Sequence, residues 1–488
     1  MPDLSPHEYR SLIRGTIPTT VDADTAAPNF EQLFTPNSHR LALDPDVTVV
    51  RGARGVGKTV WFKALQDDAL RMVAVEAYQL SALNSIQSLS GYGSERKPEA
   101  YPGPAVLRKL LRNGVEPVDI WTAVLLKGLE DQNIARFGSW PERVDWVAAS
   151  PEAVEQALSS ADRHARDENK TILILFDALD RLHEDRRQAD RLVEGILRLA
   201  LDLRLSSRRL RAKVFIRPDM LENSSLQFAD ASKLVANTAD LAWSETNLYG
   251  LFFHHLGNAN GEESQRFRQS TSRTQWRTVG DGARHVPPEK VTSDRRNQQE
   301  IFTRIAGPYM GTNHRKGHTY PWLPNHLMDG AAQVSPRSFL SALAKAAEIT
   351  GNSYGGHDRA LHYDAIRAGV QAASRIRVGE IREDIPWVAT AVMELAGLQV
   401  PMEREIIRDR WSSRTFWQQI GVGVEPDTED GDETVHTGPE ATDSDELIEE
   451  LRELGVMSYR ADGRVDVPDV YRIEFNIGRK GGVPRVSR

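Results

Sequence analysis

A glycine-rich turn between two apolar segments constrains the fold of this 488-residue chain more than any other feature. Residues 47–50 form a short β-branched run typical of a buried strand, and residues 58–65 have the apolar spacing of a helix. Between them lie Gly52, Ala53, Arg54, Gly55, Val56, Gly57, Lys58 and Thr59. Glycines allow successive backbone N–H groups to point inward, and the positive end of the following helix dipole attracts anions. The segment therefore predicts a loop that wraps phosphate groups.

Two side chains of this loop have predicted roles. Lys58 can reach the β- and γ-phosphates of a nucleotide, and the Thr59 hydroxyl is placed to ligate Mg²⁺. The same pattern also occurs by chance as a glycine-rich turn, but the flanking strand and helix supply the context that the motif requires. We therefore expect ATP and Mg²⁺ as cofactors.

The composition limits the compartment and the class of partner. The chain contains no cysteine, which excludes disulfides and thiolate zinc sites and fits a reducing compartment. It shows neither a signal-peptide core nor an uninterrupted apolar run of about 18 residues, so we expect a cytoplasmic protein without a membrane partner. The net charge is −8, but residues 425–450 hold twelve acids and no Lys or Arg. The remainder is mildly basic, which neither requires nor excludes nucleic-acid binding.

Four more apolar segments predict further strands, at residues 72–78, within 171–180, within 212–219 and at 234–243. Helical periodicity returns between them. This alternation predicts an α/β fold, in which a five-stranded parallel sheet is flanked by helices. Residues 84–104 are polar and rich in turn formers, so we expect a surface excursion there.

A carboxylate stands at the end of the third predicted strand, where doubly wound sheets place their ligands. Asp177 is therefore the candidate for holding Mg²⁺, directly or through water. Asp180, one turn further, could position or deprotonate the attacking water. An apolar run that ends in Asp is also common as a purely structural feature. The upstream phosphate loop favours the functional interpretation of Asp177, and for Asp180 both interpretations stay open.

Two arginines are candidates for contact with the γ-phosphate. Arg217 ends the strand predicted within 212–219, on the sheet edge where the phosphates would lie, although it could instead pair with Asp219. Arg337 follows Ser335 and Pro336 in the first turn of a predicted helix. A cation is electrostatically misplaced at the positive end of a helix, so an anion should face Arg337.

Composition divides the chain into segments. We expect a lead-in at 1–46, an ATPase core at 47–256, a flexible insertion at 257–297, a helical lid at 298–350, a helical region at 351–424, an acidic disordered linker at 425–445 and a small winged-helix-like domain at 446–488. The insertion surrounds Trp276 with arginines, which could contact a nucleic-acid backbone and a base, although a solvated loop fits its low apolar content better. The C-terminal region ends with Arg479, Lys480, Arg485 and Arg488, a second candidate contact with DNA.

The order of these motifs resembles the ATP-binding proteins of the AAA+ and STAND superfamilies, including the origin-recognition and initiator-like branch. The segments GARGVGKT, ILILFDALD, VFIRP, LAWSETNLYGLFF and VSPRSFL carry the resemblance over about residues 28–350. It implies that residues 52–59 are Walker A, that Asp177 is the Walker B aspartate, and that Arg217 and Arg337 are sensors 1 and 2. Ala178 stands where many AAA+ enzymes have a catalytic glutamate, which implies slow hydrolysis.

The last 40 or so residues look like a winged helix, a fold that contacts DNA in some proteins and other proteins in others. They also look like the ends of bacterial P-loop ATPases found beside antiviral or DNA-processing genes, which is an association only.

Three functions fit these features. The first is a slow ATPase that acts as a nucleotide-driven switch, in which ATP closes the lid onto the core and alters contact with a protein partner. The second is an ATPase that loads or remodels DNA, and the third is an ATP-bound scaffold without hydrolysis. Oligomers are compatible with all three.

Overall fold

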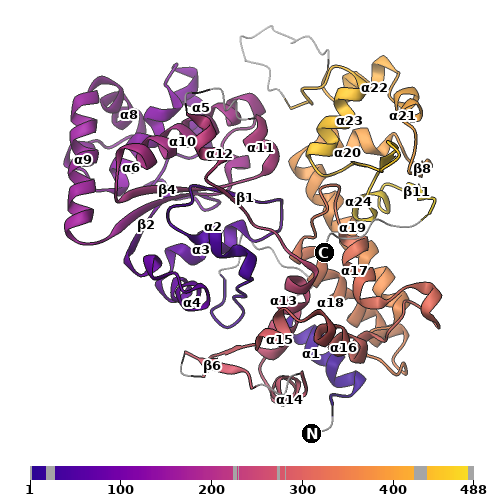
Figure 1. The fold of residues 1–488 in the computed structure, drawn as a ribbon. Helices are drawn as coiled ribbons and strands as arrows, with labels where there is room; N and C mark the ends of the chain where they lie inside the picture. Colours follow the sequence, from indigo (N-terminus) through magenta and orange to yellow (C-terminus); the bar gives the residue numbers. More distant parts are fainter. Residues whose placement is uncertain are drawn as a thin grey trace.

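The computed structural model describes residues 3–17, 28–223, 228, 230–271, 275–280, 282–422 and 437–481. A parallel sheet with helices on both faces forms one part of the molecule, and two helical regions lie beside it (Figure 1). In the described part of the chain, no helix is both long and apolar enough to cross a membrane.

The sheet contains five parallel strands in the order β2-β3-β4-β1-β5. The strands are β1 (Val49–Arg51), β2 (Ile86–Tyr92), β3 (Thr171–Phe176), β4 (Leu210–Ile216) and β5 (Thr238–Asp240). Ile172, Ile174 and Phe176 of β3 face one hydrophobic cluster, whereas Leu173 and Leu175 face another. A strand buried on both faces needs a continuous apolar run, which is why this strand was recognisable from sequence. The predicted five-stranded parallel α/β fold is confirmed.

Helices cover both faces of the sheet (Figure 1). Helices α2, α3 and α4 pack on the face of Leu173, and helices such as α6 and α10 pack on the face of Ile172. The helices of this part are α2 (Arg40–Leu43), α3 (Lys58–Gln66), α4 (Asp68–Tyr78), α5 (Pro104–Arg112), α6 (Pro117–Gly128), α7 (Gln132–Ala135), α8 (Trp140–Ala149), α9 (Pro151–Asp167), α10 (Arg186–Ser206), α11 (Pro218–Asn223) and α12 (Ala231–Val235).

The second strand was predicted in the wrong place. Residues 72–78 belong to helix α4, whose first turn is capped by Asp67, which accepts a hydrogen bond from the Leu70 amide at 2.9 Å. The second strand is instead β2, inside the segment expected to be a polar excursion. It is an edge strand and partly exposed, so its sequence lacks the apolar run of an inner strand. The fifth predicted segment, 234–243, begins in helix α12 and forms a strand over three residues only.

A second hydrophobic cluster unites the N-terminal helix with the predicted insertion and lid. Its elements are α1 (Pro6–Thr16), α13 (Glu245–Gly257), α14 (Glu262–Thr271), β6 (Arg277–Val279), β7 (Arg284–Val286), α15 (Glu289–Thr292), α16 (Arg295–Ala306), α17 (Thr319–Leu327), α18 (Pro336–Ser353) and α19 (Tyr363–Asp384). The described part of the insertion is thus folded. The insertion has few apolar residues, but two large ones, Phe267 and Trp276, are buried in this cluster. Their exposed fractions are 0% and 5%.

A third cluster joins residues on both sides of the acidic segment, from Val378 to Ile477, in one core. Its elements after α19 are α20 (Pro386–Met393), β8 (Gln399–Val400), α21 (Arg404–Arg410), α22 (Arg414–Gln419), α23 (Ser444–Glu453), β9 (Ser458–Tyr459), β10 (Val465–Asp466), α24 (Asp469–Arg472) and β11 (Gly478–Arg479). In the predicted winged-helix-like segment, β9 and β10 form a short antiparallel pair, and helix α24 follows them. Most of the predicted acidic linker, together with Arg485 and Arg488, lies outside the described residues.

Candidate nucleotide site

The predicted phosphate loop connects β1 to α3 and lies at the carboxyl end of the sheet. Gly57 precedes the helix with φ of 106°, a left-handed conformation that residues with a side chain rarely adopt. Lys58 is the first residue of α3, so the amides of the first helical turn and the positive end of the dipole face the loop. The loop thus has the local geometry that the motif predicts.

Lys58 lies across the loop rather than out in solvent. Its Nζ donates hydrogen bonds to the carbonyl oxygens of Gly52 and Ala53, at 2.7 and 3.0 Å. Burial lowers the pKa of Lys58 to about 8, although the nearby Asp177 carboxylate opposes this shift. The ammonium group is therefore held inside the loop that would wrap the phosphates.

Asp177 follows β3 and is 2% exposed. Burial raises the pKa of Asp177, and the nearby Lys58 ammonium and Thr59 hydroxyl oppose this shift. Its Oδ2 atom has no hydrogen-bond partner among the described residues. A buried carboxylate oxygen without a donor, beside a threonine hydroxyl, fits the oxygen ligands that Mg²⁺ prefers. The residues expected to hold the metal, Thr59 and Asp177, are therefore brought together.

Asp180 is placed by an unusual backbone turn. Ala178 has φ of 57°, which for a residue with a Cβ is strained and often marks a functional site. The turn leads into a short 3₁₀ segment, Leu179–Arg181, on which Asp180 is exposed to solvent. The carboxylate is thus accessible near the loop, as a residue that contacts water would be.

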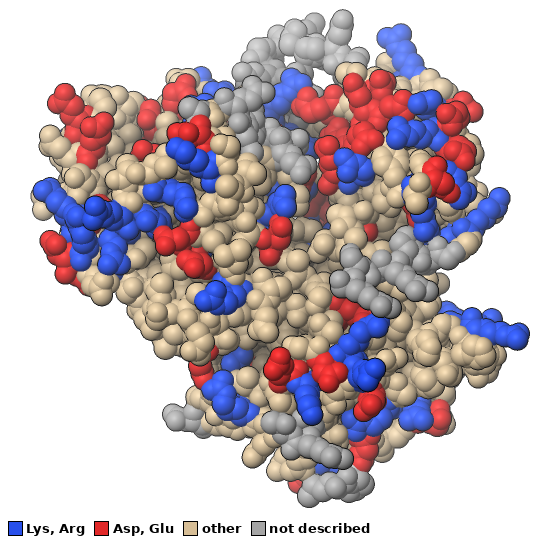
Figure 2. Space-filling view, viewed as in Figure 1, with Lys and Arg blue, Asp and Glu red and all other residues tan. Residues whose placement is uncertain are grey.

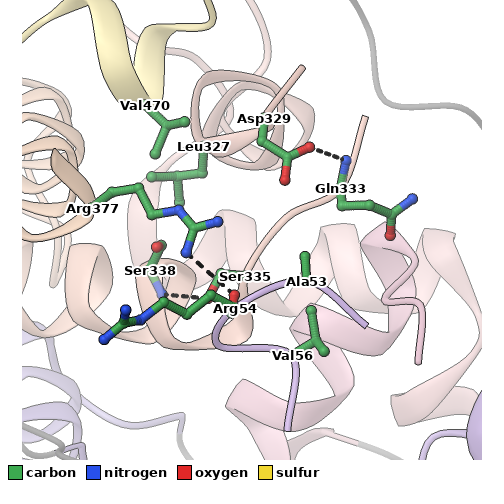
Figure 3. Close-up of a pocket in the computed structure, with 10 residues that line it drawn as sticks. All are labelled: Ala53, Arg54, Val56, Leu327, Asp329, Gln333, Ser335, Ser338, Arg377 and Val470. Atoms are coloured by element: carbon green, nitrogen blue, oxygen red, sulfur yellow. Dashed lines mark hydrogen bonds between the residues drawn. The ribbon is translucent and has the colours of Figure 1, made fainter. Parts of the chain in front are cut away.

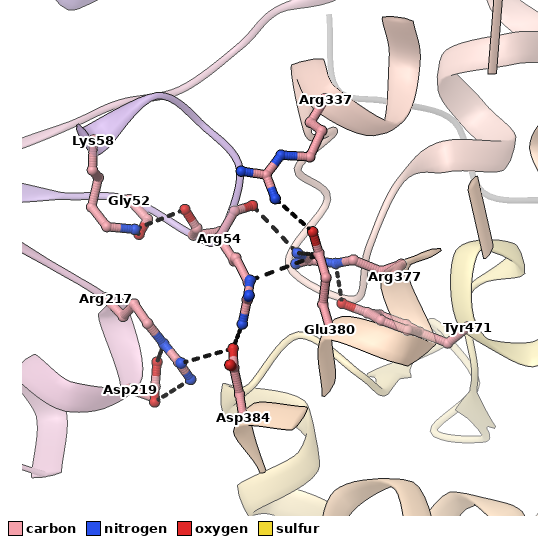
Figure 4. A network of polar contacts seen from close by, with 11 residues as sticks. Gly52, Arg54, Lys58, Arg217, Asp219, Arg337, Arg377, Glu380, Asp384 and Tyr471 are labelled. Atoms are coloured by element: carbon pink, nitrogen blue, oxygen red, sulfur yellow. Dashed lines mark hydrogen bonds and ion pairs between the residues drawn. The ribbon is translucent and has the colours of Figure 1, made fainter. Parts of the chain in front are cut away.

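Arg217 forms the ion pair that the sequence left as an alternative. Its Nε and Nη2 donate to the two carboxylate oxygens of Asp219, at 3.0 and 2.9 Å (Figure 4). Its Nη1 also lies 3.9 Å from a carboxylate oxygen of Asp384, in α19. The guanidinium group remains near the phosphate loop, but two carboxylates hold it.

Arg337 does face an anion, as its place in the first turn of α18 required. That anion is Glu380, whose Oε1 accepts a hydrogen bond from Arg337 Nη1 at 2.8 Å. The start of the same helix touches the phosphate loop, because the Ser335 hydroxyl donates to the Gly55 carbonyl at 3.3 Å. A Cβ at Gly55 would lie 2.5 Å from the Ser335 hydroxyl, so this approach requires glycine.

Helix α19 supplies a second set of contacts to the loop (Figure 4). Arg54 forms ion pairs with Asp384 and, at 3.9 Å, with Glu380. Arg377 donates to the Arg54 carbonyl at 3.3 Å, to Glu380 at 3.2 Å and to the Tyr471 hydroxyl at 3.2 Å. Because Tyr471 belongs to α24, the C-terminal cluster is linked to the phosphate loop through Arg377.

A small cavity lies where these parts meet (Figure 3). Its volume is about 10 Å³, and its lining includes Arg54, Asp329, Ser335 and Arg377. Burial raises the pKa of Asp329 to about 6. The space holds no more than about one water molecule, so the lid and the loop are in close contact.

Sequence reasoning missed Glu380, Asp384 and Arg377. Their spacing is the signal that could have found them, since residues three, four and seven apart lie on one face of a helix. The pattern of α19 marks a charged face, but it does not reveal that this face meets the phosphate loop.

Of the residues predicted to contact DNA, most that the structure describes are engaged within the chain. Arg479 has a 6% exposed side chain and pairs with Asp466 and Asp469, whereas Lys480 is exposed. In the insertion, Arg284 is buried and donates to the Leu33 carbonyl at 2.9 Å, and Trp276 is buried too. A buried indole cannot stack on a base. On the face drawn in Figure 2, acidic side chains gather at the upper right, over the C-terminal helices.

Comparisons with known proteins give distant structural matches. No family model and no curated protein matches the chain. Among solved structures, it is similar to the ORC2 protein of Aeropyrum pernix in ADPNP–ADP complexes, at 12% identity and a TM-score of 0.33 over 91% of this chain and 92% of that chain. It is also similar to the ORC1 protein of the same organism in complex with DNA, at 13% identity and a TM-score of 0.30 over 96% and 90% of the two chains. The ADP form of ORC2 matches at 12% identity and a TM-score of 0.29 over 89% and 86%.

Such low TM-scores carry no argument about function. The order of the strands, the position of the glycine-rich loop after β1 and the buried Asp177 after β3 carry the assignment of the fold. The chain has the α/β fold that its resemblance to AAA+ proteins implied, a five-stranded parallel sheet with a glycine-rich loop after β1.

Proposed function

We propose that this protein binds ATP with Mg²⁺, hydrolyses it slowly and uses the bound nucleotide to alter the contact between the phosphate loop and the lid. One observation carries the proposal. Lys58, Thr59 and the buried Asp177 meet at the carboxyl end of the sheet, and the Asp177 Oδ2 atom has no hydrogen-bond partner among the described residues.

Each residue of this group has a part in binding. The loop amides and the N-terminus of α3 would hold the β-phosphate, and Lys58 would exchange its two carbonyl partners for phosphate oxygens. Thr59 and Asp177 would hold Mg²⁺, which when bound neutralises charge on the β- and γ-phosphates. Arg217 and Arg337 would contact a γ-phosphate after giving up the carboxylates of Asp219 and Glu380.

The expected rate is slow. Ala178 follows Asp177 and has no carboxylate, and Asp180 is the acid that follows it in the turn. We assign to Asp180 the positioning of the attacking water. Catalysis by a general base depends on a held geometry, and Asp180 is exposed to solvent, so we expect slow turnover.

The switch would act on a protein partner. Arg479, Arg284 and Trp276 are engaged within the chain, which weakens the alternative of a DNA-loading ATPase. The direct link from the loop through Arg377 to Tyr471 offers a route by which nucleotide binding would alter the C-terminal surface. A place in antiviral defence or DNA processing rests on association alone.

The test is ATP binding and turnover by the purified chain, with and without Mg²⁺ and with and without duplex DNA. We expect Lys58→Ala to weaken nucleotide binding roughly 10- to 100-fold, because it removes a charge-assisted contact worth about 1.5–3 kcal/mol. Lys109→Ala, at an exposed position of α5, is the matched control. Binding without turnover would favour the scaffold, and stimulation by DNA would favour the loader. Equal affinity in wild type and Lys58→Ala would overturn the proposal.

A further inference from the structure

The side of the phosphate loop that faces the lid is held by carboxylates of this chain (Figure 4). Glu380 accepts from Arg337 and lies 3.9 Å from Arg54, while Asp384 pairs with Arg54 and lies 3.9 Å from Arg217. The side chains of Glu380 and Asp384 are only 12% and 21% exposed. Two partly desolvated acids thus converge on Arg54, Arg217 and Arg337 around one loop, and Glu380 also accepts a hydrogen bond from Arg377.

The same arginines include those with a predicted role at the γ-phosphate, Arg217 and Arg337. A guanidinium group has a limited set of donors in a fixed fork, so a donor given to a carboxylate is not available to a phosphate. In addition, a γ-phosphate brought beside Glu380 and Asp384 would meet like charge in a partly desolvated place, where repulsion is stronger than in water. A β-phosphate held by the loop amides would not need these arginines.

We propose that Glu380 and Asp384 act as an internal substitute for the γ-phosphate and make the closed arrangement selective against nucleoside triphosphates. The inference rests on the proposed nucleotide binding and adds which nucleotide opens the contact between the loop and α19. A triphosphate must displace Glu380 from Arg337 and Asp384 from Arg54, whereas a diphosphate leaves these ion pairs in place. ATP therefore opens the contact between the loop and α19, the reverse of the closure expected from sequence.

The displaced helix would carry the C-terminal cluster with it. Val378 of α19 is buried in that cluster, and only Ile385 separates the end of α19 from the start of α20. Arg377, on the same face as Glu380, donates to both the Arg54 carbonyl and the Tyr471 hydroxyl. Loss of the carboxylate contacts therefore weakens the attachment of both α19 and α24 to the loop.

The first test compares the affinity of the full chain for ADP and for a non-hydrolysable ATP analogue, each with Mg²⁺. The variants are Glu380→Gln, Asp384→Asn and the double variant, with Glu383→Gln as the control. Glu383 is an exposed acid of the same helix, so its variant removes the same charge without touching the arginines. We expect the double variant to gain about tenfold in affinity for the ATP analogue relative to ADP, within the range of ordinary coupling between sites. Glu383→Gln should leave the ratio unchanged.

The second test measures the position of the C-terminal cluster directly. Because the chain has no cysteine, Met72→Cys and Met393→Cys introduce two unique labelling sites, at side chains 51% and 49% exposed. We expect the distance between spin labels on α4 and α20 to increase with the ATP analogue and to stay unchanged with ADP. The double variant should show the longer distance without nucleotide.

The outcomes separate this inference from the proposed function. If wild type binds neither nucleotide, the proposed function itself is wrong. Two results would leave nucleotide binding in place but show that the carboxylates do not substitute for the γ-phosphate. In the first, both nucleotides bind, but the double variant and Glu383→Gln give the same ratio of affinities. In the second, the distance between the labels does not change with the ATP analogue. Should the double variant fail to fold, Asp384→Asn and the label distance in the wild-type background decide the matter.

Discussion

On the sheet side of the phosphate loop Asp177 is 2% exposed, whereas on the lid side the ion pair of Arg54 with Asp384 leaves those side chains 27% and 21% exposed. The sheet-side groups stand at the end of β3 and in the first turn of α3, and both elements lie next to the loop. The lid-side groups come from the tip of the loop and from α19, more than 300 residues later in the chain.

This difference separates a permanent part of the site from an exchangeable one. A buried carboxylate that has lost its hydration must keep a partner, because an unpaired buried charge is costly. Ion pairs that keep part of their hydration can exchange one anionic partner for another at a smaller cost than a fully buried group can. Substitutions on the sheet side should therefore impair binding or catalysis, and those on the lid side should change the balance between conformations.

The largest effect that the comparison predicts is on turnover in Asp177→Asn. The variant keeps the shape of the side chain but loses the charge that would hold Mg²⁺, so Mg²⁺-dependent turnover should fall roughly 10- to 100-fold. ADP affinity should change only a few-fold, because the loop amides remain. Titration of Mg²⁺ in a turnover assay, together with ADP binding, measures both quantities.

Asp167→Asn, an exposed site at the end of α9, is the control. Turnover equal to that of the control would remove Asp177 from the permanent part of the site.

The sheet side was largely predictable from the sequence and the lid side was not. Lys58 and Thr59 belong to a short motif, and Asp177 ends an apolar run that had to be an inner strand. The same logic failed for β2, because an edge strand does not need an apolar run, and placed a strand in α4 instead.

The lid side depends on contacts between distant segments. The requirement for an anion near Arg337 followed from the helix dipole, but the identity of that anion did not. Glu380 stands on a charged face of α19, and only the tertiary packing of α18 and α19 brings it to Arg337. Local sequence patterns describe such a face without saying what it meets.

The next effect is a pH dependence that belongs to the sheet side. Burial lowers the pKa of Lys58 to about 8, whereas phosphate binding requires the charged ammonium group. Below this pH the group is already protonated, and above it binding must take up a proton. ADP affinity should thus fall as pH rises above about 8, by at most tenfold per pH unit.

The Lys58→Arg variant isolates this effect, since arginine stays charged throughout the range. Its affinity, compared with its own value at neutral pH, should remain level between about pH 7.5 and 9.5. If ADP affinity depends on pH in the same way in wild type and in Lys58→Arg, another group titrates. The pH dependence would then not belong to the sheet side.

The smallest effect is expected at Arg54, and it is the sharpest test of the division between the two sides. Arg54 lies within the phosphate-binding motif, so the sequence alone groups it with Lys58. In the structure its side chain pairs with Asp384 and Glu380, and phosphates would be held by backbone amides instead. Arg54→Ala should therefore change ADP affinity by no more than a few-fold, against roughly 10- to 100-fold for Lys58→Ala.

The effect of Arg54→Ala should appear in α19, whose amides should exchange hydrogen faster once an anchor to the loop is lost. Arg166→Ala, at an exposed position of α9, supplies the control for loss of one positive charge. A loss of ADP affinity as large as that of Lys58→Ala would make Arg54 a phosphate ligand, and the two sides of the loop would then act as one.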